Sequence, residues 1–182
     1  MAKRYELRFS GAGGQGLMTA GIILAEAASI IEGQYAVQSQ SYGPEARGGA
    51  SKSEVIISDG PIDYPKATVV DACLAMTQEA ADKYANGIKP GGVLLLDSDF
   101  VKREPEGDFK IYKFPIIRTA KEEIGREIVG NVVALGAMIA LTDVVARDSG
   151  EKAVLNKVPE AFKDLNKKAY NMGYDKVKAL LK

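Results

Sequence analysis

The chain contains no histidine, no tryptophan and a single cysteine among its 182 residues. The absence of histidine excludes a Ser-His-Asp triad and any general base made from an imidazole. One cysteine cannot form a disulfide within the chain, and it cannot supply the several ligands of an iron–sulfur cluster or of the usual zinc sites. These classes of catalytic and metal site are therefore excluded, and we single out no catalytic residue and no metal ligand in this chain. Cys73 lies in the apolar segment 69–76, where we expect a buried, inert thiol.

The chain also lacks an excess of positive or negative charge, and it has no long apolar run. Lys and Arg number 24, Asp and Glu also number 24, and the net charge is zero, so no basic footprint for nucleic acid is present. No apolar run is long enough to span a bilayer, and residues 1–5 do not resemble the start of a signal peptide. We expect a cytoplasmic chain that binds neither membranes nor nucleic acid. The 46% hydrophobic content suits one domain spanning residues 1–182.

A glycine-rich stretch, residues 11–16, is the most informative local pattern. It reads Gly-Ala-Gly-Gly-Gln-Gly, follows an alternating segment at 5–9 and precedes an apolar segment at 17–31. This order predicts a strand, a tight turn and a helix, which is the first βα unit of a Rossmann-like sheet. We expect Gly11 to adopt a φ that a side chain forbids, Gly13 to admit a ligand or another chain, and Gly16 to let the helix pack closely. The free N–H groups at the helix start would then face outward with partial positive charge.

The remaining pattern predicts an α/β fold. Further strands are expected at 35–38, 53–58, 69–76, 93–96 and 110–114. The predicted architecture is a Rossmann-like, open, mostly parallel sheet with flanking helices and a helical C-terminal region. Asn131 is expected to cap a helix at 132–145 that is apolar on every face and hence buried or packed against another chain. Asp97 and Asp99 follow a predicted strand and are either ligand-binding groups or the acids of a solvated turn or cap.

Two features after the second predicted strand bear on ligand choice. A dinucleotide-binding unit needs an acid near this point for the ribose hydroxyls, but residues 38–41 are Gln, Ser, Gln and Ser. The next segment, 41–49, reads Ser-Tyr-Gly-Pro-Glu-Ala-Arg-Gly-Gly. Glycine and proline are typical of a surface loop, whereas Tyr42, Glu45 and Arg47 are the kind of content that functional loops carry.

Several of these stretches together resemble the gamma subunit of 2-oxoacid:ferredoxin oxidoreductases. The matching residues are 11–16, 20–28, 41–49, 90–92 and 131–142, with a C-terminal pattern of Asn166, Ala169 and Gly173. The resemblance covers residues 5–175 and is closest to the 2-oxoglutarate enzymes. It implies a subunit of an anaerobic enzyme complex that decarboxylates a 2-oxo acid on thiamine diphosphate. Electrons then pass through iron–sulfur clusters to ferredoxin, and the acyl group passes to coenzyme A.

The resemblance also implies a division of labour. The chain lacks cluster cysteines and a Gly-Asp-Gly thiamine signature, so thiamine diphosphate, magnesium and the 4Fe-4S clusters are expected on partner subunits of the alpha, beta and delta types. This chain would bind no cofactor autonomously and would contribute to the coenzyme A or inter-subunit region. The candidate residues for ligand or subunit contact are Gly11, Gly13, Gly14, Gln15, Gly16, Tyr42, Gly43, Glu45, Arg47 and Gly48.

Two other functions remain open on the sequence. The glycine spacing also suits a stand-alone nucleotide-binding Rossmann-like oxidoreductase, although the missing acid and the absence of histidine count against it. The chain could equally be a purely structural assembly subunit that binds other chains and no small molecule. Rossmann-like form does not decide among these functions.

Overall fold

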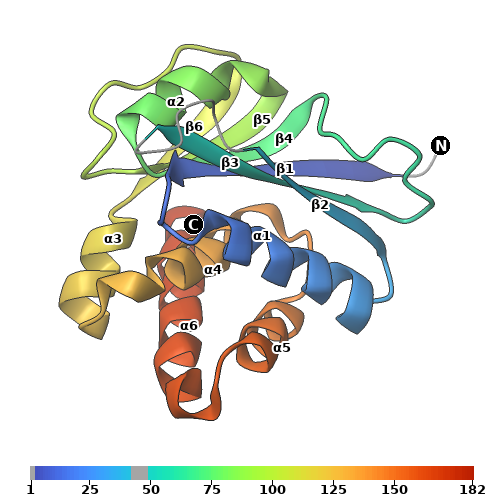
Figure 1. The fold of residues 1–182 in the computed structure, drawn as a ribbon. Coiled ribbons are helices and arrows are strands. Elements are labelled where there is room, and N and C mark those ends of the chain that lie inside the picture. Colours follow the sequence, from blue (N-terminus) through green and yellow to red (C-terminus); the bar gives the residue numbers. More distant parts are fainter. Residues whose placement is uncertain (1–2, 42–48) are drawn as a thin grey trace.

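A six-stranded sheet forms the centre of the computed structural model, which describes residues 3–41 and 49–182 (Figure 1). The strand order is β2-β3-β1-β4-β5-β6. The pairs β1–β4, β4–β5 and β5–β6 are parallel, and β3 alone runs against the others. The predicted open and mostly parallel sheet is therefore confirmed. The strands are β1 (Arg4–Ala12), β2 (Tyr35–Ser41), β3 (Ala50–Ser58), β4 (Val70–Ala75), β5 (Ile88–Asp97) and β6 (Phe109–Phe114).

The position of β3 departs from a simple βαβ unit. β3 pairs antiparallel with both β1 and β2 and so separates these two strands, with Phe9 opposite Ser53 and Val37 opposite Ile56. β2 is thus an edge strand, two positions from β1. The local pattern identified each strand but not this insertion.

Helices cover both faces of the sheet (Figure 1). Helix α2 lies on one face, and α1, α4, α5 and α6 form the layer on the other. The α-helices are α1 (Leu17–Glu26), α2 (Gln78–Tyr84), α3 (Ile116–Arg118), α4 (Gly130–Thr142), α5 (Arg147–Lys157) and α6 (Lys163–Leu180). The π-helical segments are η1 (Ala27–Ile31) and η3 (Thr119–Ile124), and the 3-10 segments are η2 (Ala85–Gly87), η4 (Glu127–Val129) and η5 (Glu160–Phe162).

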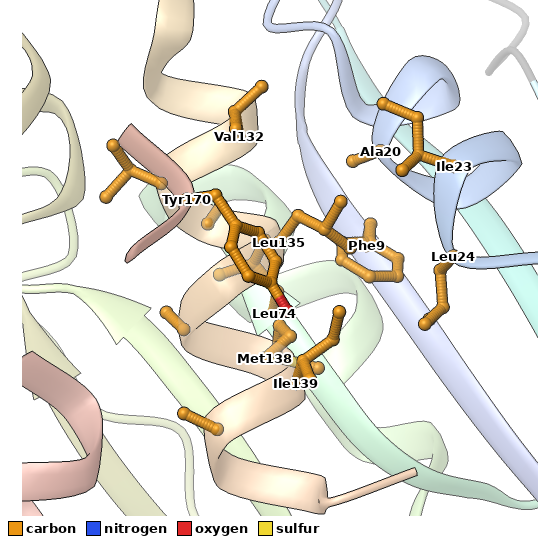
Figure 2. Close-up of a cluster of buried hydrophobic side chains, with 14 of the residues drawn as sticks. Phe9, Ala20, Ile23, Leu24, Leu74, Val132, Leu135, Met138, Ile139 and Tyr170 are labelled. Carbon is orange, nitrogen blue, oxygen red and sulfur yellow. The ribbon is translucent and has the colours of Figure 1, made fainter. Parts of the chain in front are cut away.

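Helix α4 is the centre of the larger core, as its all-apolar sequence predicted. Figure 2 shows its side chains Leu135 and Met138 between Tyr170 of α6 and Phe9 of β1, all of them fully buried. Helices α4 and α6 cross at a pair of glycines. A Cβ on Gly136 would collide with the carbonyl oxygen of Tyr170, and one on Gly173 with that of Val133. The backbones of α4 and α6 therefore approach each other closely at these two glycines.

The other face of β1 buries charge. Arg8 donates to Glu54 of β3 through Nε at 2.8 Å and to the carbonyl oxygen of Tyr84 through Nη1 at 3.0 Å. Lys52 Nζ also lies 2.8 Å from Glu54 Oε1. This network was not predicted from the sequence, because its members come from β1, β3 and α2 and meet only in the folded chain. A buried pair of this kind costs desolvation energy, which its several hydrogen bonds offset.

Candidate functional site

The glycine turn connects β1 to α1 at the carboxyl edge of the sheet, as predicted. β1 ends at Ala12 and α1 begins at Leu17. Gln15 closes the turn on itself: its main-chain N–H donates to the carbonyl oxygen of Ala12 at 3.3 Å, and its Oε1 accepts from the Ala12 N–H at 2.8 Å. The turn is therefore held by its own residues before any ligand arrives.

Gly11 is required because a side chain would not fit there, and not because of its φ. The expected special φ was therefore wrong. It lies within β1 and is not among the residues with positive φ. A Cβ at this position would collide with Gln15 Oε1 and lie 3.2 Å from Cβ of Met76. The missing side chain of Gly11 therefore leaves room for the hydrogen bond that closes the turn.

Gly16 also serves a different purpose from the one expected. Its φ of 74° is left-handed, and a Cβ there would lie 2.6 Å from Nδ2 of Asn131. Gly16 thus makes room for a side chain of α4, and not for packing of α1 on β1. The predicted role of Asn131 as an N-cap is wrong: α4 begins at Gly130, and Asn131 Nδ2 donates to the carbonyl oxygen of Gly16 at 3.2 Å. By contrast, a Cβ on Gly13 would meet nothing within 4 Å.

Two hollows open beside the turn. The first has a volume of about 230 Å³ and lies between the turn, the start of α1 and the ends of β2 and β3. Among the described residues, Lys52 is the one charged residue that lines it, beside Gln40, Ser41 and Ser51. The second has a volume of about 530 Å³ and extends from the turn to Ile117, Glu127, Ile128, Gly130 and Asn131. Thr19 lines both hollows.

The lining of the first hollow shows which side chains take the place of the missing acid after β2. Gln40 and Ser41, at the end of that strand, line the hollow together with the glycine turn. Neutral amide and hydroxyl groups therefore stand where a nicotinamide dinucleotide site would present a carboxylate to the ribose. Sequence reasoning noted the missing acid but missed Lys52, because β3 brings it to the turn only through sheet pairing.

The predicted site also included residues of the 41–49 segment. Tyr42, Gly43, Glu45, Arg47 and Gly48 lie outside the described residues. In the sequence they directly follow Ser41, which lines the first hollow. Of the predicted site residues, the structure therefore brings together Gly11, Gly13, Gly14, Gln15 and Gly16.

Asp97 forms a structural cap between β5 and α3. Its Oδ1 accepts from the N–H of Asp99 and its Oδ2 from the N–H of Ile117, both at 2.9 Å. The side chain is fully buried, and burial raises the pKa of its carboxyl above the usual value, against the lowering effect of these hydrogen bonds. Asp99 pairs with Arg118 at 3.2 Å. These contacts are those of a cap, so of the two readings left open the structural one is favoured.

Cys73 is the buried thiol that the sequence predicted. It is fully buried within β4, and burial raises its pKa to about 11. Such a thiol carries almost no thiolate at neutral pH and is a poor nucleophile.

The described part of the chain offers neither a cluster of metal ligands nor a membrane-spanning helix. Residues 3–41 and 49–182 contain no group of three His, Cys, Asp or Glu side chains placed to hold a metal ion. No helix within those same ranges has the length and apolar character needed to cross a membrane.

Comparison with known proteins gives one consistent result. The family model of pyruvate ferredoxin/flavodoxin oxidoreductase matches residues 6–176. The 2-oxoglutarate synthase subunit KorC of Methanocaldococcus jannaschii is 51% identical over 179 residues, which are 97% of this chain and 96% of the relative. The crystal structure of the keto/oxoacid ferredoxin oxidoreductase gamma subunit from Geobacter sulfurreducens superposes with a TM-score of 0.92 at 64% identity and covers 98% of both chains.

A more distant solved structure shares the fold. It is the 2-oxoglutarate:ferredoxin oxidoreductase from Magnetococcus marinus, with 2-oxoglutarate, coenzyme A and succinyl-CoA bound. The TM-score is 0.83 at 24% identity, and the match covers 97% of this chain but 31% of that one. In that enzyme the fold is thus one part of a longer polypeptide.

Proposed function

The chain belongs to the pyruvate ferredoxin/flavodoxin oxidoreductase family, as a gamma subunit of a 2-oxoacid:ferredoxin oxidoreductase, and from this premise we propose that its complex converts 2-oxoglutarate to succinyl-CoA. The proposal is supported by 51% identity to a 2-oxoglutarate synthase subunit along nearly the whole of both chains. Alpha, beta and delta subunits would carry thiamine diphosphate, magnesium and the 4Fe-4S clusters, and ferredoxin would meet those subunits. We place the complex in the cytoplasm.

Within this complex we assign the glycine turn to coenzyme A. The observation that carries the assignment is the charge of the first hollow. It is lined by the N-terminal end of α1 and by no acidic residue of the described chain. Lys52 also lines it, and its Nζ is paired with Glu54 at 2.8 Å. The helix N-terminus contributes partial positive charge and N–H donors, which suit a phosphate group. Gln40 and Ser41 can donate to phosphate oxygens, whereas a carboxylate there would repel them.

A second role for the same turn remains compatible with its shape. The open space at Gly13 would let a thiamine-bearing subunit pack directly on the backbone. The two roles differ in what they require of the isolated chain. A phosphate site would bind coenzyme A both in the isolated chain and in the assembled complex. A packing surface would bind it in neither.

Thermal shift of the purified chain tests the assignment. A ligand present at about 100 times its Kd stabilises the folded state by roughly 2.7 kcal/mol. We expect a rise in Tm with coenzyme A, a smaller rise with dephospho-coenzyme A and none with NAD. A rise with NAD and none with coenzyme A would support a stand-alone nucleotide-dependent oxidoreductase instead. Absence of a shift with any of them, in the chain and in the assembled complex, would leave the purely structural role.

A further inference from the structure

An apolar groove lies next to the glycine turn, between the η4–α4 segment and the connection from α5 to α6. Its volume is about 550 Å³. The floor is made by core residues of α1, η4 and α4, including Ile23, Val129 and Val132. The lips are Ile128 of η4 on one side and Val158, Pro159 and Phe162 on the other.

The lips hold apolar side chains that the fold itself does not use. Ile128 is 84% exposed and Phe162 is 53% exposed, so neither contributes substantially to the core. Single exposed apolar residues are ordinary, but two large ones facing a common apolar hollow mark an interaction site. Burying them against another chain would remove this surface from water, with a gain in free energy proportional to its area.

The charge of the groove indicates the chemistry of its partner. Its charged lining residues, Arg126 and Lys157, are both basic. Lys157 is already paired with Glu26 at 2.7 Å. Arg126 is exposed, and its guanidinium forms no ion pair or hydrogen bond with the described residues 3–41 and 49–182. A segment that fills the groove should therefore carry an acidic side chain beside its apolar residues, and that side chain would complement the charge of Arg126.

The position of the groove indicates which subunit supplies that segment. Thr19 and Asn131 line both the groove and the second hollow at the glycine turn. If coenzyme A binds at the turn, the acyl group reaches it from thiamine, so the thiamine-bearing subunit has to approach this edge. We propose that the groove docks an apolar segment of the thiamine-bearing subunit, whose acidic side chain pairs with Arg126. The choice of partner rests on the proposed function, whereas the docking surface rests on the groove.

The test measures assembly and coenzyme A binding separately. Ile128→Asp and Phe162→Ser are compared with Ile30→Asp and Phe100→Ser, which change the same residue types at 75% and 51% exposure elsewhere. The Kd between the variant chain and the purified thiamine-bearing subunits is measured by native mass spectrometry or biolayer interferometry. Loss of an anchor at the centre of an interface raises Kd about tenfold or more, and the controls should stay within about twofold. Phe162→Ser and the two control variants should keep the wild-type thermal shift with coenzyme A.

A charge exchange tests the partner's chemistry. Arg126→Glu should weaken assembly about tenfold or more, with Lys121→Glu, at an exposed position of the neighbouring segment η3, as the matched control. The proposal is overturned if the groove variants assemble like the controls. It is also overturned if Ile128→Asp dissociates a homodimer of this chain and leaves binding of the thiamine-bearing subunits intact. A wild-type chain that shows no shift with coenzyme A would refute the proposed ligand and leave the docking result to be judged on its own.

Discussion

Asn131 donates a hydrogen bond from Nδ2 to the carbonyl oxygen of Gly16, 115 residues earlier in the chain. That carbonyl also accepts from the N–H of Ala20, so it closes the first turn of α1 and binds α4 at the same time. Because α4 is the buried centre of the helical layer, the hydrogen bond fixes the glycine turn to the core. A ligand at the turn would therefore meet a surface that is ordered in advance, which lowers the entropic cost of binding.

Replacing Asn131 by alanine should loosen this connection. We expect Asn131→Ala to lower the free energy of unfolding by about 1 kcal/mol, the usual net value of one hydrogen bond between neutral groups. Urea unfolding measures the loss, and amide hydrogen exchange should show faster exchange at the start of α1. Asn86→Ala, at an exposed asparagine, is the control. Equal stability of the two variants would show that the contact does not hold the turn.

Gly13 and Gly16 should respond differently to alanine. At Gly16, alanine would adopt a left-handed φ at a cost of about 1–2 kcal/mol and would also displace Asn131. At Gly13, a Cβ meets nothing within 4 Å. The free energy of unfolding of Gly13→Ala should therefore lie within about 0.5 kcal/mol of the wild-type value. If Gly13 faces coenzyme A, the same variant should raise KM for coenzyme A in the complex and leave KM for the 2-oxo acid unchanged. Equal loss of stability in the two variants would show that the contact of a Cβ with Asn131 and the left-handed φ at Gly16 cost little.

The glycine stretch shows what could be predicted from the sequence. Its spacing, the alternating segment before it and the apolar segment after it are all local features, so the strand, the turn and the helix were predicted correctly. The reasons for Gly11 and Gly16 were not, because the side chains that need the space belong to Gln15 and Asn131. Asn131 was predicted to have a local role as a helix cap, and nothing in its spacing along the chain points to a partner at Gly16.

Strand order and the lining of the hollow lay beyond the sequence for a related reason. The insertion of β3 between β1 and β2 is a non-local pairing that residue patterns along one segment do not encode. It brings Lys52, whose Nζ is paired with Glu54, to the lining of the first hollow. The function could be predicted without these details, because the combined motifs at 11–16 and 41–49 resemble one family.

The crossing of α4 and α6 should be intolerant of any added side chain. A Cβ at Gly136 or Gly173 would collide with main-chain carbonyl oxygens, and the two helices would have to separate. Overpacking of this kind costs roughly 1–3 kcal/mol or more, so we expect Gly136→Ala and Gly173→Ala each to lower Tm by several degrees. Differential scanning fluorimetry measures the change. A variant as stable as Gly13→Ala would show that the helices can move apart at little cost.

Arg47 is the remaining basic candidate for coenzyme A. It belongs to the family-matching segment 41–49, and the prediction rests on its charge and its place in the sequence. Arg47→Ala in the assembled complex should raise KM for coenzyme A roughly tenfold, since charge-assisted hydrogen bonds contribute about 1.5–3 kcal/mol. Reduction of ferredoxin with 2-oxoglutarate and varied coenzyme A measures this. Unchanged coenzyme A kinetics together with unchanged assembly would remove Arg47 from the site.

Asp97 should give the chain a specific dependence of stability on pH. Burial raises the pKa of this carboxyl in the folded chain above the 3.8 of an unperturbed aspartate. The folded state therefore holds the proton more tightly than the unfolded state does. The resulting contribution to stability is fully present below the unfolded pKa and is lost as pH rises through the raised pKa of the folded chain.

Asp97→Asn removes that proton equilibrium and keeps the shape of the side chain. We expect the free energy of unfolding of the wild type, relative to Asp97→Asn, to fall as pH rises from about 3 to 7. The amide also leaves either Asp99 or Ile117 without its acceptor, which lowers the variant's stability by a similar amount at every pH. The slope with pH therefore reports the carboxyl, and the offset reports the lost hydrogen bond. Urea unfolding of both proteins across this range measures the two quantities, with Asp108→Asn at an exposed side chain as control. A rising difference would mean that the hydrogen bonds to the carboxylate outweigh its burial.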